Sequence, residues 1–214
     1  MQQYGEIDPD LTLRQAYEKY LHPDNLNLND KDTWDKIKEG KILSFFQFDS
    51  NVGSQGIKTV QPETITDLSY TNGVIRLMAE DGKERPLEKF ARYKQDISLW
   101  YDEMRQEGLN EQEQKVMERY MLESHGVAIS QEQIMWSLID PDICGFSLKD
   151  ANAARKVISK KKMDKLPALR EKILASAKSK ALGEYEWNYV VMPSAGYGFS
   201  VVMALTHLTC LSQG

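Results

Sequence analysis

The sequence contains few of the residues that mark secreted, metal-binding or membrane proteins. Its 214 residues include only two cysteines and three histidines. Two cysteines imply no disulfide framework and fit a reducing compartment. The histidines have no ligand spacing with one another or with the cysteines, which predicts no zinc site. Because there is no apolar run near the roughly 20 residues that span a bilayer, and no signal-peptide pattern, we expect a soluble, cytoplasmic protein.

Glycine and proline are also scarce, at 13 and 7 residues, which argues against a disordered or collagenous chain. The chain contains neither an internal repeat nor a low-complexity tract. Its composition is that of an ordinary globular protein, 41% hydrophobic and 28% charged. A chain of this length can bury a substantial core, in one large domain or two small ones.

The spacing of apolar residues predicts a mainly α protein, a multi-helix domain with one or two short extended segments. Residues 10–21 can form a helix with Leu13 and Tyr17 on one apolar face. The stretch KILSFFQFDS, residues 41–50, is the best candidate for a strand and is rich in core side chains. After Pro62, residues 63–78 predict a helix that Gly73 weakens by about 1 kcal/mol relative to alanine.

Capping signals mark several further helices. Residues 87–96, 97–108 and 110–124 predict three helices in succession. Capping boxes at Ser130–Gln133 and Ser147–Asp150 predict the starts of two more. Because a proline cannot donate a backbone hydrogen bond, Pro167 should interrupt or restart the second of these.

Basic residues are concentrated between residues 151 and 182. This segment has ten Lys or Arg and two Asp or Glu, a charge of +8, although the whole chain carries −5. Such an asymmetry predicts a surface that meets a polyanion, although a solvated helix face is the alternative. On a helix that starts near Ser147, one face would carry Arg155, Ser159 and Lys162, with Lys156 and Lys160 on the adjacent stripe and Val157 and Ile158 towards a core.

The chemistry of this segment favours phosphate over base recognition. A guanidinium fork and several ammonium groups suit phosphate oxygens. Since the segment has nothing suited to reading base edges, any contact should be independent of nucleic-acid sequence.

Five short motifs occur in an order that is typical of one enzyme family. They are Phe46-Gln47-Phe48-Asp49-Ser50 followed by Gln61-Pro62, Arg76-Leu77-Met78-Ala79, Ser130-Gln131-Glu132-Gln133, the basic stretch 154–162, and Ala195-Gly196-Tyr197-Gly198-Phe199. The series resembles the fingers region of the C-family replicative DNA polymerases, the bacterial DNA polymerase III α subunit. The resemblance covers roughly residues 30–200. Where the sequence diverges from the bacterial subunits, it resembles phage-encoded members of the family more closely.

The resemblance implies which residues contact nucleotide. Candidate nucleotide- or phosphate-binding residues are Arg76, Arg155, Lys156, Lys160, Lys161 and Lys162. Candidate template contacts are Gln131, Gln133 and Tyr197, although the glutamines could instead cap a helix and the tyrosine could be a core residue. Of the family's Arg-Pro-Gly-Pro turn only Arg76 remains, and the basic motif is one residue longer than in the family.

The resemblance also implies what this chain lacks. The catalytic aspartates of the family lie in a palm domain, and no Asp-x-Asp strand pattern occurs here. Asp140 and Asp142 flank a proline and are predicted to be turn residues. The chain alone is therefore expected to be catalytically silent and to bind no cofactor, with Mg²⁺ bound only where a separate palm is present.

The predicted organisation has three segments: an N-terminal helical extension (1–29), a fingers-like domain (30–199) and a divergent apolar tail (200–214). Expected partners are DNA primer–template and dNTP, and the remaining polymerase polypeptide; no membrane is expected. Three hypotheses stay open: a fingers module of a polymerase, a stand-alone phage DNA- or replisome-binding protein derived from the fingers fold, and a helical interaction protein with a solvated basic face.

Overall fold

The computed structural model describes residues 8–20, 22–25, 27–42, 47–79, 82–160, 162 and 164–196. Within these ranges there are eleven α-helices and no β-strand, so the prediction of a mainly α fold is confirmed. The centre of the predicted extended stretch, residues 43–46, lies outside the described ranges. Ile42 and Phe48 on either side of it are buried, as expected of core anchors.

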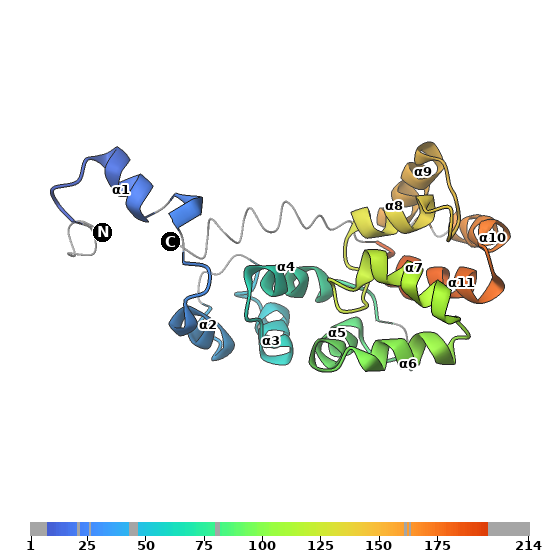
Figure 1. Ribbon diagram of the computed structural model, residues 1–214, viewed down its shortest axis with the longest axis horizontal. Helices are drawn as coiled ribbons and strands as arrows, with labels where there is room; N and C mark the ends of the chain where they lie inside the picture. Colours follow the sequence, from blue (N-terminus) through green and yellow to red (C-terminus); the bar gives the residue numbers. More distant parts are fainter. Residues whose placement is uncertain are drawn as a thin grey trace.

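The helices follow one another with short connections. They are α1 (Leu13–Tyr20), α2 (Lys31–Lys38), α3 (Asn51–Val60), α4 (Ile65–Val74), α5 (Pro86–Gln95), α6 (Ser98–Gln106), α7 (Glu111–Met121), α8 (Gln131–Ile139), α9 (Leu148–Ser159), α10 (Leu166–Ser176) and α11 (Lys180–Tyr185), with 3-10 turns η2 (Pro23–Asn25) and η4 (Met192–Ser194) and the π-helical segment η3 (Glu186–Val191). Figure 1 shows α1 at one end of the molecule and α10 at the other, with α3 to α8 between them.

The predicted caps start the helices of the functional region. The Ser130 hydroxyl accepts from the Gln133 amide, and the Gln133 side chain accepts from the Ser130 amide, which closes the box at the start of α8. At the start of α9 only half of the predicted box forms: the Ser147 hydroxyl accepts from the Asp150 amide, and the Asp150 carboxylate accepts from the Ser147 hydroxyl rather than from its amide. Each such cap stabilises a helix by about 1 kcal/mol. Pro167 lies in the first turn of α10, where its missing N–H is not needed, so the predicted restart is confirmed.

Helix α3 was not predicted, because two glycines lower the helical propensity of its sequence. Both glycines serve close packing. A Cβ atom at Gly53 would lie 2.5 Å from the Cα atom of Phe48, and one at Gly56 would lie 2.5 Å from Cγ2 of Ile75. The helix predicted over 63–78 is α4, which ends at Val74, directly after Gly73.

Two hydrophobic cores hold the helices together. The smaller one packs α2, α3 and the start of α4 around Phe48, Ile57 and Leu68. The larger one extends from the end of α3 to η3 and includes Trp100 and Tyr185. Ile75, just after α4, packs against both cores, so the end of α4 is fixed from two sides.

The N-terminal helix forms where it was predicted, but its apolar face is not buried. Leu13 is 90% exposed and Tyr17 is 48% exposed, whereas Ala16 is buried. The helical spacing therefore predicted the element but not its packing.

Candidate phosphate-binding surface

Three of the sequence motifs, far apart along the chain, meet in the structure. The Met78 amide, two residues after Arg76, donates to the Pro193 carbonyl at 2.8 Å. The Gly196 amide, at the start of the Gly-Tyr-Gly-Phe motif, donates to the Ile158 carbonyl at 2.8 Å, in the last turn of α9. These two backbone hydrogen bonds place the end of α4, the end of α9 and residues 193–196 at one surface.

Helix packing holds Arg155 in a fixed orientation on α9. Its Nη1 donates to Oε1 of Gln131 at 3.0 Å, across the contact between α8 and α9. Its Nε and Nη2 donate to Oδ1 of Asn152 at 3.1 and 3.0 Å. A guanidinium has five N–H groups, so these three bonds leave two for a ligand. Sequence reasoning missed Asn152, which lies one helical turn before the arginine.

The lysines after Arg155 remain available. Lys156, Lys160 and Lys162 are exposed, and within the described ranges they form no salt bridge. Two other cations of the basic segment are paired: Arg170 with Glu184 and Lys172 with Asp150, each at 2.7 Å. Lys165, Lys178 and Lys180 are also exposed and form no salt bridge within the described ranges, so the end of α9 holds three of the uncompensated cations of the segment, close together in sequence.

The predicted face of the basic helix needs one correction. Helix α9 ends at Ser159, so Lys162 lies beyond the helix and does not continue the stripe from Arg155. Its amide instead donates to the Val157 carbonyl at 3.1 Å, which turns the chain back on the helix end. Because the C-terminal end of a helix carries a partial negative charge, cations are stabilised there. Ile158 is buried, as predicted, and Val157 is half-buried.

Of three further candidate residues, the structure describes only Arg76. Arg76 is exposed on the turn after α4, where its amide donates to the Gly73 carbonyl. Lys161 and Tyr197 lie outside the described ranges.

Gln133 is saturated by internal hydrogen bonds. Its Nε2 donates to the Tyr120 carbonyl at 2.9 Å and to Oγ of Ser124 at 2.6 Å. Its Oε1 accepts from the amides of Ile129 and Ser130 at 2.9 and 2.8 Å. Gln133 therefore fixes the entry into α8, and Gln131 positions Arg155.

Asp140 and Asp142 form part of a turn that is held by Arg119. The Arg119 guanidinium lies 3.0 Å from Oδ2 of Asp140 and 2.9 Å from Oδ2 of Asp142. Burial opposes ionisation of Asp140, but hydrogen bonds from Tyr120, the Asp142 amide and Arg119 lower its pKa overall. Nowhere in the described ranges do three or more His, Cys, Asp or Glu side chains gather in a way that could hold a metal ion.

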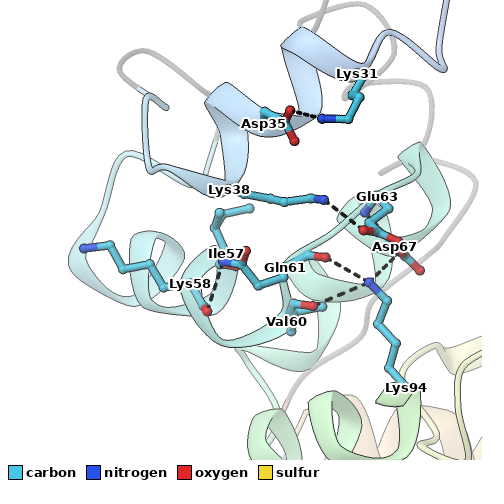
Figure 2. Close-up of polar contacts among 10 residues, drawn as sticks. All are labelled: Lys31, Asp35, Lys38, Ile57, Lys58, Val60, Gln61, Glu63, Asp67 and Lys94. Atoms are coloured by element: carbon cyan, nitrogen blue, oxygen red, sulfur yellow. Dashed lines mark hydrogen bonds and ion pairs between the residues drawn. The ribbon is translucent and has the colours of Figure 1, made fainter. Parts of the chain in front are cut away.

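The Gln61-Pro62 motif supports α4 from its start (Figure 2). Gln61 ends α3 in the left-handed conformation, with φ of 51°. Lys94 on α5 donates to the Gln61 carbonyl at 3.0 Å and lies 2.9 Å from Oδ2 of Asp67 in the first turn of α4. Burial opposes ionisation of Asp67, but His125 and Lys94 together lower its pKa to about 2. One ammonium group thus joins α3, α4 and α5.

Comparison with known proteins identifies the family. The sequence profile of the bacterial DNA polymerase III α subunit finger domain matches residues 10–181. The chain belongs to this family. The end of α9 and the turn that carries Arg76 both lie within the matched residues.

Individual relatives support the same assignment. This fingers domain is 37% identical over 207 residues to "DNA-directed DNA polymerase" of Bacillus phage SPbeta and, equally, to "Probable DNA polymerase YorL" of Bacillus subtilis (strain 168). It is 27% identical over 180 residues to "DNA polymerase III subunit alpha" of Treponema pallidum (strain Nichols). These alignments cover 95% of the chain for the two Bacillus proteins and 81% for the Treponema protein.

The fingers domain is small beside these relatives. It spans 16% of the length of the two Bacillus proteins and 14% of the Treponema protein. None of the described helices has the length and apolar character that crossing a membrane requires.

Proposed function

We propose that this fingers domain holds the phosphates of template DNA or of an incoming dNTP, while a palm domain on another part of a polymerase carries out nucleotidyl transfer. The observation that carries the proposal is the group of exposed lysines, Lys156, Lys160 and Lys162, which form no salt bridge within the described ranges and follow the oriented guanidinium of Arg155 along the chain. Arg76 is exposed on the turn after α4, and the backbone of that turn is linked through Pro193 to the segment whose Gly196 amide bonds the end of α9.

The physical basis is electrostatic. The described part of the surface offers guanidinium and ammonium donors that suit phosphate oxygens, and contacts to phosphate carry no information about base sequence. Each cation that neutralises a phosphate of duplex DNA releases condensed counterions, with a salt slope of about 0.9 per contact. We therefore expect binding that depends on salt and not on DNA sequence.

In this proposal the chain positions phosphates and takes no part in the bond-forming step. Nucleotidyl transfer uses two metal ions held by carboxylates. Asp140 and Asp142 are instead engaged by Arg119 and, for Asp140, by Tyr120. Mg²⁺ would be held by the palm of the longer polypeptide, and the remainder of that polypeptide is the expected protein partner.

The test is fluorescence anisotropy with a labelled primer–template at low salt. Replacing Lys156, Lys160 and Lys162 by alanine should weaken binding by at least about tenfold, since three phosphate contacts are removed. A matched variant replaces three exposed lysines on α1, α3 and α7, Lys19, Lys58 and Lys115, and so changes the net charge equally. Equal losses in both variants, or no binding by the wild type, would contradict the proposal.

A further inference from the structure

A second surface lies on α7 and α8, with chemistry opposite to that of the basic surface. A pocket of about 540 Å³ opens there, and its lining includes the aromatic rings of Tyr70, Tyr120 and Trp136. Trp136 is 57% exposed, whereas the other three tryptophans of the chain are buried. Leu122, also on the lining, is 43% exposed. Large apolar side chains gathered at an open pocket mark a binding surface.

The polar part of the lining is acidic. Glu118, Glu123 and Glu132 all line the pocket, together with a single cation, Arg119. That cation is already held by Asp140 and Asp142. The pocket therefore presents uncompensated negative charge beside aromatic rings.

Two neutral donors of the lining are engaged internally, and Glu118 and Glu123 accept from the Tyr101 and Tyr70 hydroxyls, which leaves their charge in place. The Tyr120 hydroxyl donates to Asp140, and both amide hydrogens of Gln133 are taken up internally. By contrast, Oε2 of Glu132 is buried and has no hydrogen-bond partner among the described residues. A buried carboxylate oxygen without a partner is costly. The matching ligand is thus rich in donors and positively charged.

Two other ligand classes fit less well. Within the described ranges the carboxylates do not converge closely enough to hold a metal ion. A nucleic-acid backbone would bring phosphates towards three glutamates, and like charges repel. Aromatic faces beside carboxylates instead suit a guanidinium or an ammonium group, through cation–π contact and charge-assisted hydrogen bonds.

We propose that this pocket docks a basic segment of a partner protein. An arginine or lysine of that segment lies among Tyr70, Tyr120 and Trp136 and donates to Glu132, while a neighbouring apolar side chain covers Leu122. This site shares no residue with the phosphate-binding surface, although Glu132 is next to Gln131, which holds Arg155. Its occupant is a peptide rather than DNA.

The experiment measures binding of the protein to immobilised acetylated hexapeptide pools with a fixed central residue. Pools with central arginine or lysine should retain about tenfold more protein than pools with central glutamate or glutamine, as expected for a cation–π contact with charge-assisted bonds. Trp136→Ala and Glu132→Gln should each remove this preference. Because Trp136 is largely exposed and Glu132→Gln is isosteric, both variants should fold, and circular dichroism should confirm this.

The matched control is the variant with alanine at Lys156, Lys160 and Lys162, which should lose DNA binding and keep the peptide preference. The proposal is overturned if no pool is preferred, or if the preference survives both pocket variants. It is also overturned if sedimentation shows a concentration-dependent dimer that Trp136→Ala abolishes, because a second copy of this chain would then be the occupant.

Discussion

At the scale of single residues, Glu186 shows what burial does to a carboxyl group. It lies in the π-helical segment η3 and is fully buried in the larger core. Oε1 accepts from Oγ of Ser137 at 2.6 Å, and Oε2 has no partner among the described residues. Burial, only partly offset by that hydrogen bond, raises the pKa of Glu186 to about 7.

Because of this raised pKa, ionisation of Glu186 at higher pH should lower the stability of the fold. Between pH about 4.5 and about 7 the folded protein binds more protons at Glu186 than the unfolded chain, so stability falls as pH rises through that range. Glu186→Gln removes the ionisable group and keeps an acceptor for Ser137. The variant should gain on the order of 3 kcal/mol relative to wild type on going from pH 5 to pH 8.

Urea denaturation at both pH values measures this gain. Glu171→Gln, at an exposed position of α10, provides the control and should follow the wild type. If Glu186→Gln and the wild type have parallel pH profiles, the buried carboxyl is not the source of the dependence.

At the scale of helices, Asp67 and Lys94 join α3, α4 and α5. The Asp67 carboxylate is 13% exposed and lies 2.9 Å from Nζ of Lys94. Its lowered pKa contributes stability above pH about 4, which is lost as pH falls towards 2. Asp67→Asn should therefore cost about 2 kcal/mol at pH 7 and progressively less below pH 4.

Thermal or chemical denaturation across pH 2.5 to 7 tests this dependence. Asp164→Asn, at an exposed position, should leave stability unchanged. A loss for Asp67→Asn that is constant with pH would assign the effect to packing and not to charge.

The glycines of α3 give a prediction that runs against helical propensity. Alanine in place of a helical glycine normally stabilises by about 1 kcal/mol. At Gly53 the new Cβ atom would meet the Phe48 backbone at 2.5 Å, and backbone cannot move aside as a side chain can. Gly53→Ala should therefore destabilise by about 2 kcal/mol, as measured by urea unfolding; a gain in stability would contradict this packing.

At the scale of the whole molecule, the sequence predicted elements better than the contacts between them. Caps at Ser130 and Ser147 marked α8 and α9 because a capping box is a local pattern. The hydrogen bonds from Met78 to Pro193 and from Gly196 to Ile158 could not be predicted, since the periodicity of a helix carries no information about distant partners.

The same limit applied to the charges of the candidate site. The sequence located the basic segment and its phosphate-binding candidates, but it could not predict that Arg170 and Lys172 are neutralised by Glu184 and Asp150. Nor could it predict that Asn152 and Gln131 hold Arg155. The order of the motifs predicted the family, whereas the ion pairs between helices show which cations are neutralised.

The most direct test of the central claim is the salt dependence of primer–template binding by the wild type and by the variant with alanine at Lys156, Lys160 and Lys162. If these lysines contact phosphates, the slope of log K against log salt should become less negative by about 3 in the variant, at roughly 0.9 for each lost contact. The matched variant at Lys19, Lys58 and Lys115 should keep the wild-type slope. Identical slopes for all three proteins would show that the end of α9 does not hold phosphate.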